Sequence, residues 1–195
     1  MKNSLLNILK EYLLLFPSEK KRQSTILNYL QKHTDGEIID WNNFDGHIVA
    51  GGFVYAKCEN EFLVLYHSDL EMYLYPGGHI NPDDKNPLHA AKREIKEETG
   101  LDNLKQLKLS KNELIPIDID THTISYNKRL KLPEHYHFEF RYLFMINKKE
   151  DIKIDREEMS NYKWISFEEL GNDSNYGRII NKIQETLLKD KLNKL

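Results

Sequence analysis

The sequence predicts an α/β protein with a mixed sheet and an additional helical segment at its N-terminus. Apolar residues recur at helical spacing near both ends of the chain, and runs typical of strands fill its middle. One strongly patterned helix, over about 88–99, separates two groups of these strands. A chain of 195 residues suits one domain with an appendage. We therefore expect a helical extension over residues 1–40 and one α/β domain over residues 41–195.

In the first forty residues the spacing predicts a helical hairpin. Intervals of three and four residues separate the apolar positions of the first helix, which are Leu5, Leu6, Ile8, Leu9, Tyr12 and Leu13. Pro17 and Ser18 break the pattern, and a second helix is expected from about Glu19 to Lys32. The residues leave three roles open for this hairpin: a packing cover, a dimer contact and a lid over a substrate.

Strands are predicted from His47 onward. Before the patterned helix they are IVAGGFVYA, FLVLYH and MYLY, the last of them closed by the turn residues Pro76, Gly77 and Gly78. After it, strands are expected over 115–124, 137–146 and 164–165, with a polar loop over 127–134 and a final helix over about 179–188. Three aromatic residues are expected in the core, with stacking on a nucleotide base as the alternative: Trp41, Phe44 and Tyr126.

Composition limits the partners and the compartment. The chain has 28 Lys and Arg against 31 Asp and Glu, so no general basic field is present to hold a nucleic-acid polymer. Cys58 is the only cysteine, which excludes an internal disulfide and fits a reducing cytoplasm. Charged residues such as Lys10 and Glu11 interrupt the apolar N-terminus, so a signal peptide is not expected, and no apolar run approaches the roughly 20 residues of a membrane span. We expect a small-molecule partner.

The patterned helix carries three carboxylates on one face. Glu94, Glu97 and Glu98 stand at positions i, i+3 and i+4, which brings their Cβ atoms within about 5–6 Å of one another. A separate apolar stripe anchors the helix on a core, and it consists of Leu88, Ala91 and Ile95. Gly100 suits the left-handed position that ends a helix. From the glutamates alone, a solvated acidic helix face is the alternative interpretation.

The run from Gly78 to Leu101, GHINPDDKNPLHAAKREIKEETGL, resembles the Nudix box of Nudix hydrolases, G-x5-E-x7-R-E-U-x-E-E-x-G-U with U aliphatic. The spacing from Gly78 to Arg93 is one residue longer than usual, and Asp84 or Asp83 stands in place of the first glutamate. The resemblance covers roughly residues 46–170. It implies an α/β/α sandwich and the hydrolysis of a phosphoanhydride.

The resemblance also assigns roles within the box. Glu94, Glu97 and Glu98 would be the metal ligands, and oxygen ligands of this kind suit Mg²⁺, with Mn²⁺ as a substitute. Such a metal binds diphosphate oxygens, offsets charge at phosphorus and lowers the pKa of a bound water. Arg93 matches the arginine that orients the glutamates, against the alternative of a surface ion pair with Glu97. Gly77 and Gly78 combine turn chemistry with a bare backbone that can approach a phosphate.

A base that activates water is expected either in the box or in a later loop. Glu157 and Glu158 precede Trp164-Ile-Ser-Phe-Glu-Glu-Leu, which is similar to the closing segment of the family. Glu158 is therefore a candidate catalytic residue. A solvated acidic turn is the alternative.

A later strand is rich in histidine. Its polar face carries His135, His137, Glu139 and Arg141. The preceding strand shows the same alternation at Asp118, Asp120 and His122. We expect this face to line the substrate cleft, with His137 at the substrate and Arg141 on a phosphate. A second metal held by the two histidines at 135 and 137 is an alternative.

The leading hypothesis is a metal-dependent pyrophosphohydrolase that acts on a nucleoside diphosphate linked to another group. A non-catalytic nucleotide sensor on the same fold is the second. An isomerase of diphosphate lipids is the third, and it would need Cys58 as a catalytic group. A homodimer is compatible with each hypothesis.

Overall fold

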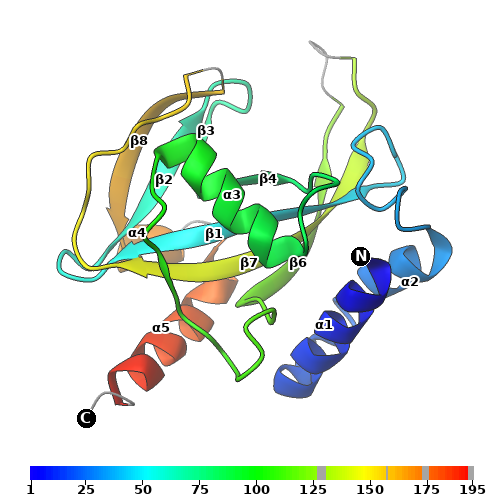
Figure 1. Ribbon diagram of the computed structural model, residues 1–195, viewed down its shortest axis with the longest axis horizontal. Coiled ribbons are helices and arrows are strands. Elements are labelled where there is room, and N and C mark those ends of the chain that lie inside the picture. The colour runs from blue at the N-terminus through cyan, green and yellow to red at the C-terminus, as the bar shows by residue number, and fades with distance from the viewer. Residues whose placement is uncertain (127–130, 157, 173–175, 193–195) are drawn as a thin grey trace.

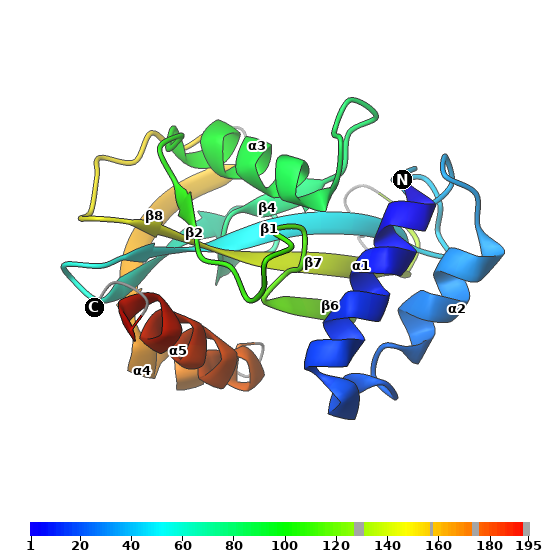
Figure 2. The ribbon, with the colours of Figure 1, turned by 60° about the horizontal axis from the view of Figure 1, so that its bottom comes forward.

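In the computed structural model, which describes residues 1–126, 131–156, 158–172 and 176–192, a mixed sheet lies between helices. The helices are α1 (Lys2–Leu15), α2 (Ser24–Lys32), α3 (Pro87–Thr99), α4 (Phe167–Asn172) and α5 (Gly177–Leu192), with a 3₁₀ turn at Pro17–Glu19. The strands are β1 (His47–Ala56), β2 (Glu61–His67), β3 (Met72–Leu74), β4 (Gly77–His79), β5 (Lys105–Gln106), β6 (Asp118–Ile124), β7 (His135–Ile146) and β8 (Met159–Ser166). Helix α3 covers one face and α4 with α5 the other, so the predicted α/β/α sandwich is confirmed (Figures 1 and 2).

The centre of the sheet is the parallel pair β1 and β7. Its register runs from His47 opposite His137 to Ala56 opposite Ile146. The other pairings are antiparallel: β4 joins the first half of β1, β2 joins its end, β6 joins β7, and β3 and β8 flank β2. The first half of β1 therefore lies between β4 and β7, and side chains from these three strands can meet.

Alternation along β1 and β7 divides the core into two parts. Ile48, Ala50 and Val54 pack on the face that carries α3, together with Phe138 and Phe140 of β7. The opposite face packs against α5. There the apolar set includes Phe53, Tyr55, Leu143 and Ile179. The polar residues of β7 lie on this second face.

The N-terminal helices pack against the edge of the sheet near β6 (Figure 2). The hydroxyl of Tyr12, a fully buried residue, donates to Glu19 Oε2 at 2.6 Å and lies 3.1 Å from Asp118 Oδ1. Asp118 also pairs with Arg22 of the connection before α2 and Lys182 of α5. These contacts join the extension to the sheet, as a packing cover does. The domain division at residue 40 stays a prediction.

The structure corrects several sequence-based expectations. Gly77 and Gly78, expected in a turn, form strand β4, because they pair with β1 at Gly51 and Ala50. Strand β6 begins at Asp118, three residues later than expected, while β8 is longer than predicted, and β5 and α4 were not predicted. Residues 127–130 of the expected polar loop lie outside the described part of the chain.

The expected burial of three aromatic residues is wrong. Trp41 is 55%, Phe44 39% and Tyr126 55% exposed. The first two lie in the irregular segment between α2 and β1, and connecting segments run over the surface. Across the described residues, no helix has the length and apolar character that crossing a membrane requires.

Candidate active site

The ends of α3 are fixed by local chemistry. The Asn86 side chain accepts a hydrogen bond from the His89 amide at 2.9 Å, and Pro87 occupies the first turn. Gly100 ends the helix in the left-handed conformation, with φ 75°, and its amide donates to the Lys96 carbonyl at 2.9 Å. These contacts define where α3 begins and ends. The packing of its apolar residues on the sheet then determines which way its carboxylates point.

Glu98 is a buried carboxylate held against strand β4. It is 6% exposed, and the Gly77 amide donates to its Oε2 at 3.0 Å. Burial, with the nearby Glu94 charge, raises the pKa of Glu98 to about 9 although the Gly77 hydrogen bond lowers it. An ionised Glu98 therefore needs a compensating positive charge.

Glu94 lies beside Glu98 and against the second glycine of β4. A Cβ atom added to Gly78 would lie 2.8 Å from the Glu94 carboxylate, so only glycine leaves this space. Burial raises the pKa of Glu94 to about 7, while the guanidinium of Arg93 opposes the shift. Two partly desolvated carboxylates thus meet at one strand edge. Their oxygen-only chemistry fits a hard divalent cation.

Glu97 does not join this buried pair. Its side chain is 55% exposed, and its Oε2 lies 2.7 Å from Nη1 of Arg93. In the described part of the chain, the carboxylates of Glu94, Glu97 and Glu98 do not form a set of ligand atoms within 4.8 Å of one another. The assignment of Glu97 as a metal ligand stays a prediction.

Arg93 connects the helix carboxylates to the loop before the helix. It reaches Glu94 at 2.9 Å and the His79 carbonyl at 2.8 Å. It also pairs with Asp84, whose side chain is 1% exposed, whereas Asp83 is exposed. Of the two aspartates near the position of the first box glutamate, Asp84 is therefore the one that contacts Arg93. The loop between Gly78 and α3, although one residue longer than usual, therefore still places an aspartate against Arg93.

Glu158 lies in the turn before β8, near enough for its charge to act on Glu94 and Glu98. It is exposed, and its charge raises the pKa of both Glu94 and Glu98. Glu157 lies outside the described residues. Asp155 also raises the pKa of Glu98, and its amide lies 3.3 Å from the Glu98 carbonyl. Sequence reasoning missed Asp155 because a single aspartate in a loop belongs to no pattern.

Arg141 and His137 lie on the other face of the sheet. Arg141 is 4% exposed, and its guanidinium reaches Asp120 at 2.8 Å and Glu139 at 3.0 Å. These carboxylates compete with any phosphate, so the phosphate role of Arg141 stays a prediction. His137 contacts His47, its register partner. Sequence reasoning missed His47 because pairing between distant strands is invisible in one sequence.

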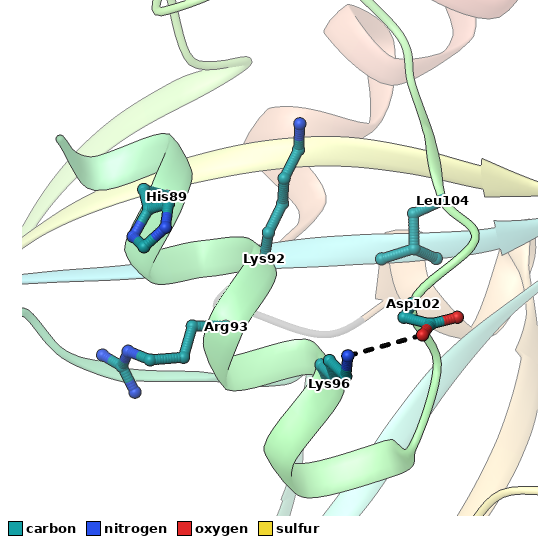
Figure 3. A pocket seen from close by; sticks show the side chains of 6 residues that line it. All are labelled: His89, Lys92, Arg93, Lys96, Asp102 and Leu104. Atoms are coloured by element: carbon teal, nitrogen blue, oxygen red, sulfur yellow. Dashed lines mark ion pairs between the residues drawn. The ribbon is translucent and has the colours of Figure 1, made fainter. Parts of the chain in front are cut away.

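A surface hollow of about 420 Å³ lies beside α3. Its lining residues are His89, Lys92, Arg93, Lys96, Asp102 and Leu104. Figure 3 shows that Lys92 and Arg93 leave the helix in different directions and that Lys96 bridges to Asp102, at 3.4 Å. Neither Glu94 nor Glu98 lines this hollow, so the carboxylate pair lies elsewhere on the helix.

Comparison with known proteins identifies similar sequences. The model of the NUDIX domain matches residues 45–183. A curated protein named "Probable DHNTP pyrophosphohydrolase" from Lactococcus lactis subsp. cremoris is 30% identical over 108 residues, 55% of this chain, and the match covers 59% of that relative's length.

Two solved structures share the fold. The Ap4A hydrolase binary complex of C. elegans is 22% identical, with a TM-score of 0.55 over 73% of this chain and 98% of the other. A NUDIX family hydrolase from Clostridium perfringens is 26% identical, with a TM-score of 0.55 over 72% of this chain and 95% of the other.

Proposed function

The chain belongs to the Nudix family, and from that premise we propose that it hydrolyses a phosphoanhydride bond in a nucleoside diphosphate linked to another group. The observation that carries the proposal is the pair formed by Glu98, which is buried, and Glu94, which is partly buried, beside Gly77 and Gly78. Two carboxylates in a desolvated site are costly as anions unless a cation binds between them. They provide this cation site next to a backbone that a phosphate can approach.

Mg²⁺, or Mn²⁺ in its place, is the proposed cation, with Glu98, Glu94 and Glu97 as its ligands. When bound, it would polarise the diphosphate and lower the pKa of a water molecule. Arg93 holds Glu94 and Glu97 through hydrogen bonds and so limits the orientations of these carboxylates. Gly77 and Gly78 are the proposed phosphate contacts, because they lie against Glu98 and Glu94.

Glu158 is the proposed base. Its position near Glu94 and Glu98 would allow it to accept a proton from the attacking water. The water oxygen would then form a new bond to phosphorus while the bridging P–O bond of the anhydride breaks, and the leaving phosphate group departs with the bridging oxygen.

The substrate class is tested with a panel of compounds. We expect the purified protein with Mg²⁺ or Mn²⁺ to release a nucleotide from nucleoside diphosphate sugars, dinucleoside polyphosphates or ADP-ribose. DHNTP belongs in the panel because it appears in the name of the Lactococcus relative. Mass spectrometry of products formed in ¹⁸O-labelled water identifies the phosphorus that is attacked. Absence of turnover with every compound and both metals would contradict the proposal.

The metal assignment is tested with Glu98→Gln. This substitution removes a charge but keeps the size and the hydrogen bond with Gly77, so we expect a folded protein whose kcat falls by about 10³-fold or more. Its matched control is Glu150→Gln in the exposed loop before β8. Equal turnover by wild type and Glu98→Gln would exclude Glu98 as a required ligand.

The alternatives make different predictions. A sensor would show ligand-induced thermal stabilisation without turnover, but the full set of box carboxylates favours catalysis. Cys58 is exposed in the turn that follows the end of β1, whereas β4 and the carboxylate pair lie at the first half of that strand. This separation from the candidate site disfavours the isomerase. Cytoplasmic location and a homodimer remain part of the proposal, and light scattering would test the latter.

A further inference from the structure

Four histidines converge on the sheet face opposite α3. The Nε2 atom of His47 lies 3.0 Å from Nε2 of His137 and 3.0 Å from Nε2 of His79. Nε2 of His135 lies 3.3 Å from that of His137. These residues come from β1, β4 and β7, which adjoin one another in the sheet. The cluster is therefore a product of the sheet register.

Hydrogen bonding alone does not satisfy this cluster. A neutral imidazole nitrogen either donates one proton or accepts with one lone pair. Four Nε2 atoms therefore form at most two full hydrogen bonds, whereas three short contacts connect them. His47 is 1% and His135 7% exposed, so water has little access to either. A metal cation at the centre of the cluster would be coordinated by the Nε2 lone pairs of several histidines at once.

The spacing of His47, His79 and His137 is close to that of three ligands of a tetrahedral metal. With zinc–nitrogen bonds of about 2.0–2.1 Å, neighbouring ligands of a tetrahedron lie about 3.3 Å apart. Ligand atoms of His47, His79 and His137 all lie within 4.8 Å of one another. The Nδ1 of His135 lies 2.8 Å from the Pro133 carbonyl, which makes Nδ1 the donor and leaves the Nε2 lone pair facing His137.

We propose that His47, His79 and His137 bind a transition-metal ion of the Zn²⁺ class at a site distinct from the carboxylate pair, with His135 as a neighbouring imidazole. Imidazole ligands favour zinc and related metals, whereas the carboxylates of α3 favour Mg²⁺. Strand β4 connects the two sites, because Gly77 and Gly78 contact Glu98 and Glu94 while the side chain of His79 joins the cluster. The bound ion would fasten this short edge strand to β1 and β7.

The test is zinc binding by tag-free, chelator-treated, full-length protein in excess Mg²⁺, which occupies carboxylate sites. Competition with a chromophoric chelator should show one Zn²⁺ per chain. X-ray absorption should show several imidazole nitrogens at about 2.0–2.1 Å. Thermal unfolding should shift to higher temperature with Zn²⁺. None of these measurements requires a nucleotide or turnover, so they succeed or fail independently of the proposed function.

Variants distinguish the two sites. His137→Gln and His79→Gln should each weaken zinc binding by about 100-fold or more, since loss of even a supporting group costs 10–100-fold. The His79 side chain is exposed on an edge strand, so its variant should fold even if His137→Gln does not. His67→Gln on β2, outside the cluster, and Glu98→Gln should both keep wild-type zinc affinity. Equal affinity in His79→Gln and wild type, or a shell of oxygen ligands only, would overturn the proposal.

Discussion

Asp84 and Arg93 form a bidentate ion pair: Nη2 of the arginine lies 2.8 Å from Oδ2, and Nε lies 3.2 Å from Oδ1. Burial of Asp84 raises its pKa, but the hydrogen bonds from Arg93 and the Asn81 amide outweigh burial and hold this pKa below its usual range. The aspartate thus stays ionised and links the loop to the helix. The contact thus gives Asp84 a defined role in positioning the arginine.

Asp84→Asn should therefore change the orientation of the carboxylates of α3 although Asp84 makes no direct contact with them. The amide cannot offer two anionic oxygens to the guanidinium, so Arg93 and with it Glu94 lose their fixed orientation. We expect kcat to fall by about 100-fold, because displacement of a catalytic group by about 1 Å costs that much. Breaking the buried pair should also cost about 3 kcal/mol of unfolding free energy. Steady-state kinetics and urea denaturation would measure both, and Asp83→Asn in the same loop should change neither.

Gly78→Ala should lower activity with little change in secondary structure. The added methyl group would lie 2.8 Å from the Glu94 carboxylate, which must then move away from Glu98. We expect a fall in kcat of about 100-fold and weaker Mg²⁺ activation. The matched control is Gly36→Ala, where no atom lies within 4 Å of the added group. Wild-type metal activation in Gly78→Ala would show that this close approach does not position Glu94.

Glu158→Gln tests the assignment of the base. Loss of a general base lowers the rate by about 10²–10⁴-fold. We expect this fall in kcat at unchanged KM and unchanged Mg²⁺ activation. Glu150→Gln serves as the control in the same region. A kcat equal to that of the wild type would assign the base to another group.

Asp118→Asn should destabilise the protein in a pH-dependent way. Asp118 is fully buried, and although burial raises its pKa, Lys182, Arg22 and Arg141 lower it below the usual value. A depressed pKa stabilises the fold above the unfolded pKa of about 3.9, and that stability is lost as pH falls below it. At pH 7 we expect Asp118→Asn to cost about 3–5 kcal/mol, since it leaves buried cations without their partner.

The measurement for Asp118 is denaturant unfolding at pH 7 and pH 3. The difference between wild type and Asp118→Asn should shrink at pH 3. Activity measured under stabilising conditions should change far less than stability. Asp151→Asn, at an exposed position, provides the control. A difference of equal size at both pH values would contradict the electrostatic explanation.

Local patterns predicted helix α3 well. The spacing of Leu88, Ala91 and Ile95, with Gly100 as the stop signal, predicted a helix that is found at Pro87–Thr99. The box residues predicted the fold and the family. Strand β4 was not predicted, because its pairing with β1 outweighs the turn preference of Pro76, Gly77 and Gly78.

The sequence by itself determined the helix, its three glutamates and the arginine among them, because helical periodicity is a local property of the chain. Only the tertiary structure decided that Glu98 is buried and Glu94 partly buried while Glu97 is exposed, and that Asp84 rather than Asp83 holds Arg93. It also brought His47 and His79 to His137. Such contacts depend on which strands pair and in which register, and register arises from the packing of the whole sheet.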